Sequence, residues 1–94
     1  MEEVERVFQD MEKVSGFSKE QILCKSRIPP IPALRWFIGE RLIELGWSNN
    51  KTANILKINH STLFHGLKQI PIMPKDKRWH GEYEIYKEFR ALCK

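Results

Sequence analysis

The sequence predicts an all-α fold: a compact bundle of about five or six helices that contains a helix-turn-helix. Apolar residues recur with helical spacing in several stretches, and no stretch alternates polar and apolar residues as a half-buried strand would. Capping residues, glycines and prolines separate these stretches. With 94 residues, of which 41% are apolar, the chain can form one core and hardly two. We therefore interpret residues 1–94 as a single domain.

The leading segment, residues 1–16, is predicted to form an amphipathic helix that ends at a glycine. Its apolar side chains share one helical face, and they are Val4, Val7, Phe8, Met11 and Val14. Ser18, with Gln21 three residues later, forms the capping box of a short second helix. The proline-rich stretch 28–32 is predicted to be non-helical because proline lacks an N–H donor and restricts the residue before it.

A longer helix is predicted from Pro32 to Gly46, because proline is tolerated in a first helical turn and glycine favours a helix end. Its buried stripe consists of Leu34, Phe37, Ile38, Leu42 and Leu45. The helix that follows can be capped by Ser48, Asn49 or Asn50.

Residues 50–70 predict a helix-turn-helix. A short helix that carries the small residue Ala53 is followed by a turn of about three residues and by a second helix, 60–70. Ala53 lets the two helices cross closely, and Ile58 and Leu63 fill the crossing. Polar residues at the start of the second helix would then point outward. An ordinary helical hairpin is the alternative interpretation of this pattern.

A trailing helix is predicted within residues 76–93, beginning at Asp76 or Lys77. Pro71 ends the preceding helix and disfavours helical geometry at Ile70. The apolar face of the trailing helix consists of Trp79, Tyr83, Tyr86, Phe89 and Leu92.

The charge is distributed unevenly along the chain. Residues 1–14 carry five acidic and two basic residues, whereas residues 25–78 carry ten basic and three acidic ones. Such a concentration of positive charge is typical of a nucleic-acid contact surface. A solvated basic surface without a ligand is the alternative.

Several classes of protein are not expected. No apolar run approaches the ~18 residues of a membrane span, and the acidic N-terminus does not resemble a secretory signal. The two cysteines, Cys24 and Cys93, fit a reduced cytoplasm, and Cys24 is expected to be buried. The spacing of His60 and His65 occurs in zinc sites, but no C-x-x-C pair accompanies it. We therefore expect no metal, no cofactor and no enzymatic activity.

Residues 59–70 resemble the signature of the C-terminal duplex-binding domain of DnaA, the bacterial replication initiator. The family signature is Asp-His-Thr-Thr-Val-(x)-His-Ala-(x)-(x)-Lys-Ile. Here the stretch is Asn59-His60-Ser61-Thr62-Leu63-Phe64-His65-Gly66-Leu67-Lys68-Gln69-Ile70. The similarity spans roughly residues 1–92, although Asn59 replaces the family's Asp and the turn lacks its two glycines. Since no P-loop motif occurs, the resemblance implies a stand-alone DnaA-C-like or Trp-repressor-like domain.

The resemblance implies that the chain binds double-stranded DNA, with helix 60–70 in the major groove and the basic segment 25–35 on the phosphate backbone. Independently of the family, Ser61, His65 and Lys68 follow i, i+4, i+7 spacing on the face away from the apolar stripe. The predicted DNA-binding residues are Lys25, Arg27, Arg35, Lys57, Asn59, His60, Ser61, Thr62, His65 and Lys68.

The second hypothesis is a helical protein-interaction module that uses the amphipathic helices 1–15 and 78–93. Under the first hypothesis, a domain of this size reads a short half-site, so binding can require a homodimer or a partner protein. The expected setting is an accessory role in replication or transcription in a bacterium, phage or mobile element.

Overall fold

The computed structural model describes residues 2–24 and 26–93, and this part of the chain is 80% helical and contains no strand. The all-α prediction is therefore confirmed. Two 3-10 helices, η1 (Ile70–Lys75) and η2 (Lys77–Trp79), connect the last two α-helices. The α-helices are α1 (Glu2–Ser15), α2 (Lys19–Leu23), α3 (Ile31–Glu44), α4 (Asn49–Leu56), α5 (His60–Gln69) and α6 (His80–Leu92).

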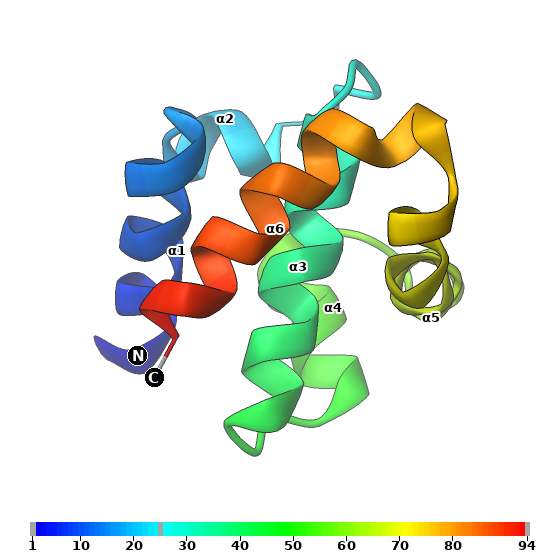
Figure 1. Cartoon of the computed structure of the whole chain (residues 1–94). Helices are drawn as coiled ribbons and strands as arrows, with labels where there is room; N and C mark the ends of the chain where they lie inside the picture. The colour runs from blue at the N-terminus through cyan, green and yellow to red at the C-terminus, as the bar shows by residue number, and fades with distance from the viewer. Residues whose placement is uncertain (1, 25, 94) are drawn as a thin grey trace.

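Helix α3 is the centre of the bundle, because α1, α2, α4, α5 and α6 all pack against it. Helices α1 and α5 lie on opposite sides of α3, and α6 crosses in front of it (Figure 1). The side chains of Leu34, Phe37, Ile38 and Leu42 on α3 are fully buried. This arrangement leaves α5 at one edge of the molecule, far from the acidic helix α1.

The first two helices form as the sequence predicts. In α1, the side chains of Val4, Val7, Phe8 and Met11 are buried against the core. The capping box of α2 is present: the Ser18 backbone N–H donates to Gln21 Oε1 at 2.8 Å, and the Gln21 N–H donates to Ser18 Oγ at 3.3 Å. These short-range bonds orient the chain between α1 and α3.

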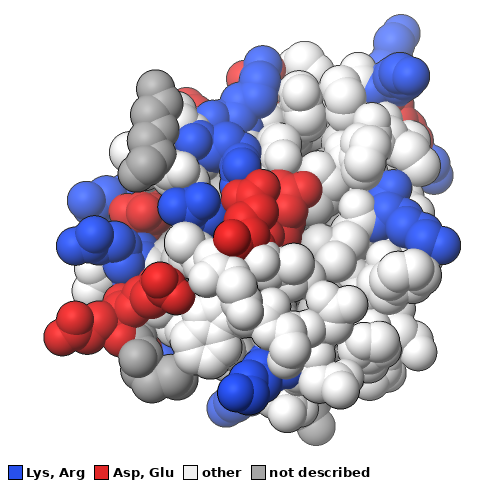
Figure 2. All heavy atoms as spheres, turned by 90° about the horizontal axis from the view of Figure 1, so that it is seen from below, with Lys and Arg blue, Asp and Glu red and all other residues white. Residues whose placement is uncertain are grey.

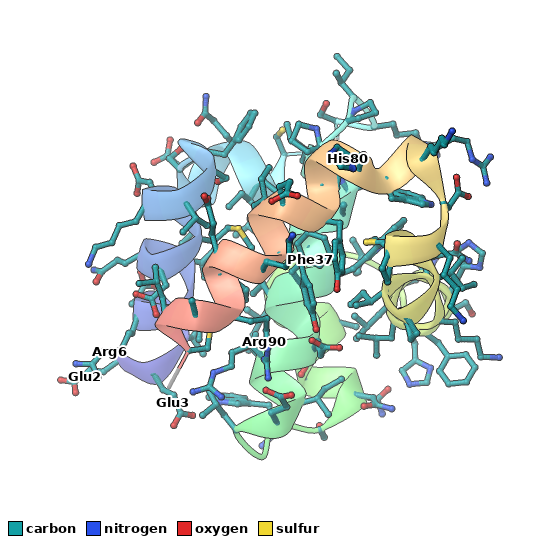
Figure 3. All side chains as sticks on the ribbon, viewed as in Figure 1. Glu2, Glu3, Arg6, Phe37, His80 and Arg90 are labelled. Atoms are coloured by element: carbon teal, nitrogen blue, oxygen red, sulfur yellow. The ribbon has the colours of Figure 1, made fainter. Side chains whose placement is uncertain are left out.

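Polar contacts join α6 to the C-terminal half of α3. Arg90 donates two hydrogen bonds to Glu44, from Nη1 to Oε1 at 2.6 Å and from Nη2 to Oε2 at 2.9 Å. The Tyr86 hydroxyl donates to Glu40 Oε1 at 2.8 Å. Figure 3 shows Arg90 on the side of α6 that faces α3, with Phe37 lying beneath α6. The hydrogen bonds from Arg90 hold the pKa of Glu44 below its usual range.

Replacing Glu44 with glutamine is expected to lower the free energy of unfolding at neutral pH by about 0.5–1 kcal/mol, as for a partly exposed but bidentate ion pair. Because the pKa of Glu44 is lower in the folded protein, its contribution is fully present above the unfolded pKa of about 4.3. It is lost as the pH falls through the lowered pKa. Urea denaturation at neutral pH and near pH 2 measures this. If the variant is less stable than the unaltered protein by the same free energy of unfolding at both pH values, the ion pair does not have this role.

The structure corrects four local predictions. The trailing helix α6 begins at His80 and not at Asp76 or Lys77, because Asp76 caps the separate 3-10 helix η2 by accepting from the Arg78 N–H. Helix α3 begins at Ile31, one residue before the predicted start. Ile70 has helical angles, φ −57° and ψ −48°, and the chain continues through Pro71 as η1, which buries Ile70 and Met73 in the core. Cys24, which was expected to be buried, is exposed at the C-terminal end of α2, where its Sγ donates to the Gln21 carbonyl. None of the described helices combines the length and apolarity needed to cross a membrane.

Candidate nucleic-acid interface

Helices α4 and α5 form a helix–turn–helix arrangement through local hydrogen bonds. Ser48, one of three candidate caps, caps α4 by accepting from the Lys51 N–H at 3.2 Å. Lys57 adopts a left-handed conformation, with φ +58°, and turns the chain. Asn59 then caps α5 by accepting from the Thr62 N–H at 2.8 Å. The predicted pair of helices is present, and Asn59 provides the cap of the second helix.

Two glycines allow α5 to approach α3 closely. A Cβ atom on Gly39 of α3 would lie 2.7 Å from Leu63 Cδ1, and one on Gly66 of α5 would lie 2.1 Å from Trp36 Cδ1. Both distances are below van der Waals contact. At Gly39 the terminal methyl group of Leu63 could move aside, whereas at Gly66 the Cβ would meet the base of the Trp36 indole, so the close approach depends most strongly on Gly66. The pattern of apolar residues alone does not predict this role. The available signal was a glycine inside each predicted helix, where its low helix propensity requires a packing reason.

The outer face of α5 is polar and open to solvent. His60, Ser61, Phe64, His65 and Lys68 are all exposed. Together with Asn49 of α4, these residues line a hollow of about 360 Å³, which we call the outer hollow. The structure therefore brings together four of the predicted DNA-binding residues, namely His60, Ser61, His65 and Lys68. It adds Asn49 and Phe64, which are not among the predicted ones.

A second hollow, of about 300 Å³, separates the loop after α2 from the turn before α5. We call it the basic hollow, because three of its lining residues are cationic and none is acidic. Its lining residues are Leu23, Cys24, Arg27, Arg35, Lys57, Ile58, Asn59 and Thr62. The first turn of α5 adjoins it, and unpaired backbone N–H groups at a helix N-terminus favour an anion. The basic hollow thus combines side-chain and backbone features that suit a phosphate.

Arg35 was predicted to contact the phosphate backbone, and the structure corrects this role. The residue is only 9% exposed, and burial lowers the pKa of its guanidinium. Its Nε donates to the Ile22 carbonyl at 2.7 Å, and its Nη2 donates to the carbonyls of Cys24 and Ser26. Arg35 therefore holds the loop that carries Arg27 and is a positioning residue. Lys25, predicted from the same basic segment, lies outside the described residues.

The surroundings of α5 carry positive charge without acidic neighbours. No acidic residue occurs between Glu44 and Asp76. Within residues 2–24 and 26–93, no ion pair involves Lys51, Lys57 or Lys68. Seen from below, carboxylates gather at the centre of the face and on the side of α1, whereas the side of α5 is mainly uncharged with separate cations (Figure 2). These cations are free to attract an external anion.

The histidines of α5 do not form part of a metal centre in the described structure. Among the residues placed there, no group of three or more His, Cys, Asp and Glu side chains could hold a metal ion. His60 and His65 instead share the outer hollow with Ser61 and Asn49. Their imidazoles are available as hydrogen-bonding groups on an open surface.

Comparison with known proteins does not identify the chain. No protein family, no curated protein and no solved structure matches it. The resemblance of residues 59–70 to the DnaA signature therefore stays a prediction. The function is inferred from the two hollows, the exposed face of α5 and the charge around them.

Proposed function

We propose that this chain is a sequence-preferring double-stranded DNA-binding domain that inserts α5 into the major groove. One observation carries the proposal: the outer face of α5 is polar, exposed and free of acidic residues, and it lies beside a hollow lined by cations. The major groove is about 12 Å wide and admits an α-helix with its side chains. In helix-turn-helix proteins that bind DNA, the second helix of the pair enters the major groove, and α5 is the corresponding helix here.

The position of α5 in the bundle supports this docking. Helix α5 lies at the edge of the molecule opposite α1 (Figure 1). A duplex on the outer face of α5 would therefore be separated by the width of the bundle from the acidic side chains of α1. Since like charges repel, this separation favours one orientation of the domain on DNA.

The proposed contacts divide between bases and phosphates. His60, Ser61 and His65 line the outer hollow and would reach base edges, where a hydroxyl can contact either donors or acceptors. Arg27 and Lys57, together with the start of α5, would hold a phosphate at the basic hollow. The phosphate contacts would fix the orientation of the domain, and the base contacts would set its sequence preference.

Replacing Lys57 with asparagine tests the proposed phosphate contact. Asparagine removes the charge and tolerates the left-handed backbone at this position. We expect weaker binding to every duplex and a reduction of about one in the slope of log affinity against log salt. Fluorescence anisotropy with a labelled random-sequence duplex at several salt concentrations measures both quantities.

Lys87→Gln is the matched control, because Lys87 is an exposed lysine of α6 that is paired with Glu84. It is expected to leave the salt slope unchanged. The proposed function fails if the unaltered protein does not bind a duplex even at ~50 mM salt, where phosphate contacts are strong. If Lys57→Asn and Lys87→Gln have the same affinity and the same salt slope, Lys57 does not contact a phosphate.

The second hypothesis is an interaction module built on the amphipathic helices α1 and α6. The apolar face of α1 is buried in the core. On α6, Phe89 is buried, Tyr83 and Tyr86 are half-buried, and Leu92 is 44% exposed, so this face is partly open. The exposed face of α5 and the cations around it favour DNA, and we therefore propose an accessory role in replication or transcription, as a homodimer or beside a partner protein where a half-site gives too little affinity.

A further inference from the structure

Two residues of the outer hollow, Asn49 and Phe64, are exposed and are not part of a helix cap or of the buried core. We infer that Asn49 and Phe64 together read an A·T base pair from its major-groove edge. This inference rests on the proposed function and deepens it, because it names the base pair that part of the site prefers.

Asn49 is available to bind a base because it does not cap α4. Ser48 caps that helix through its Oγ atom, which accepts from the Lys51 N–H. The Asn49 amide makes no hydrogen bond within the described part of the chain, and the residue is exposed. It lines the same hollow as Ser61 and His65 of α5. An asparagine amide presents a donor beside an acceptor, which matches the N7 acceptor and N6 donor of adenine.

Phe64 is a large apolar residue on an otherwise polar surface. It is 52% exposed, whereas its neighbours Leu63 and Gly66 face the core. The Lys68 ammonium lies 4.4 Å from the centre of the Phe64 ring, a cation–π contact that restrains both side chains. An apolar side chain at the major groove contacts the C5-methyl group of thymine. Asn49 and Phe64 thus supply groups that suit the two bases of one pair.

The other side chains of the hollow favour the same choice. The outer hollow contains no acidic residue that could accept from the N4 amine of cytosine, and no arginine that could bind guanine through two hydrogen bonds. Its one lysine, Lys68, could also donate to guanine, but its ammonium lies over the Phe64 ring, so that Phe64 and Lys68 share one position in the hollow. The remaining lining residues, His60, Ser61 and His65, can contact several bases, so the preference at this position depends on Asn49 and Phe64.

Base analogues test the inference directly. The preferred site is first selected from a random duplex library with the unaltered protein. Each thymine of that site is then replaced with uracil, which lacks the methyl group, and each adenine with 7-deazaadenine, which lacks N7. We expect one thymine and one adenine, paired with each other, at which replacement weakens binding by about 5–10-fold.

The protein variants assign those two effects to the two residues. Phe64→Ala is expected to bind the thymine and uracil duplexes equally, and Asn49→Ala to bind the adenine and 7-deazaadenine duplexes equally. Phe64→Leu keeps an apolar contact and should retain part of the discrimination between thymine and uracil. Asn54→Ala, which alters an exposed asparagine of α4 outside the hollow, is the control and should behave as the unaltered protein.

The outcomes separate this inference from the proposed function. If the unaltered protein binds no duplex, both fail. If it binds and selects a site, but Phe64→Ala and Asn49→Ala keep the full sensitivity to uracil and 7-deazaadenine, only the reading of an A·T pair is overturned. Circular dichroism of each variant confirms that the helices are intact.

Discussion

Replacing Gly66 with alanine is expected to lower the free energy of unfolding by about 2–3 kcal/mol, as for an overpacked core position. The added Cβ would lie 2.1 Å from Trp36 Cδ1 and 2.3 Å from Trp36 Cγ. These atoms belong to the root of the indole, so a small movement of its far end gives no relief. The indole also packs against Trp79, with ring centroids 5.6 Å apart. Helices α3 and α5 would therefore have to separate.

Denaturation by urea, followed by circular dichroism, measures this loss. Gly81→Ala is a matched control, because Gly81 lies in α6 and a Cβ there meets no atom within 4 Å. It should leave stability unchanged or raise it by up to about 1 kcal/mol through helix propensity. Replacing Trp36 with leucine in the Gly66→Ala background should recover part of the loss. Equal stability of the two glycine variants would contradict the close approach.

Replacing Arg35 with lysine is expected to cost about 2–3 kcal/mol, even though the charge is kept. The guanidinium donates to three backbone carbonyls between Ile22 and Ser26, and a lysine ammonium cannot reach them with the same geometry. Hydrogen bonds to a charged donor are worth about 1.5–3 kcal/mol, so losing part of this set, which includes the buried bond to the Ile22 carbonyl, carries a cost of this size. The loop that carries Arg27 would then lose its attachment to α3. Urea denaturation and the salt dependence of DNA binding together measure both consequences.

The comparison with Arg27→Lys separates positioning from direct contact. Arg27 is exposed, and replacing it with lysine should leave stability unchanged. If Arg35 acted only by touching phosphate, Arg35→Lys would likewise keep its stability and most of its affinity. A stable Arg35→Lys variant would therefore overturn the positioning role that the hydrogen bonds assign to it.

Sequence patterns predict the helices of this protein well because the interactions that begin and end them are local. The capping box links Ser18 to Gln21, and the cap of α5 links Asn59 to Thr62, so each pair is three residues apart. The apolar face of α1 is visible in the spacing of its buried residues. The same reasoning fails at Ile70, where burial of η1 against the core outweighs the local preference of a residue before proline.

The candidate site was predicted less completely, since its residues meet across the fold. Arg35 has the same charge in the sequence as Arg27, but only the tertiary structure buries it against carbonyls of an earlier loop. Phe64 could have been selected as an apolar residue at an outward position of an amphipathic helix. Asn49 had no such signal, because as a residue type it was an equally good cap.

The sequence by itself determined the all-α class, the approximate positions of the helices, and the polar outward face of α5. It also determined that α5 lies in a segment without acidic residues. These properties depend on residues three or four apart and on the order of charges along the chain. The tertiary structure alone decided that Gly66 meets Trp36, that Asn49 joins the face of α5, and that Arg35 supports the loop which carries Arg27. Such contacts depend on how helices distant in the chain pack around α3, and packing geometry is not encoded in any local spacing.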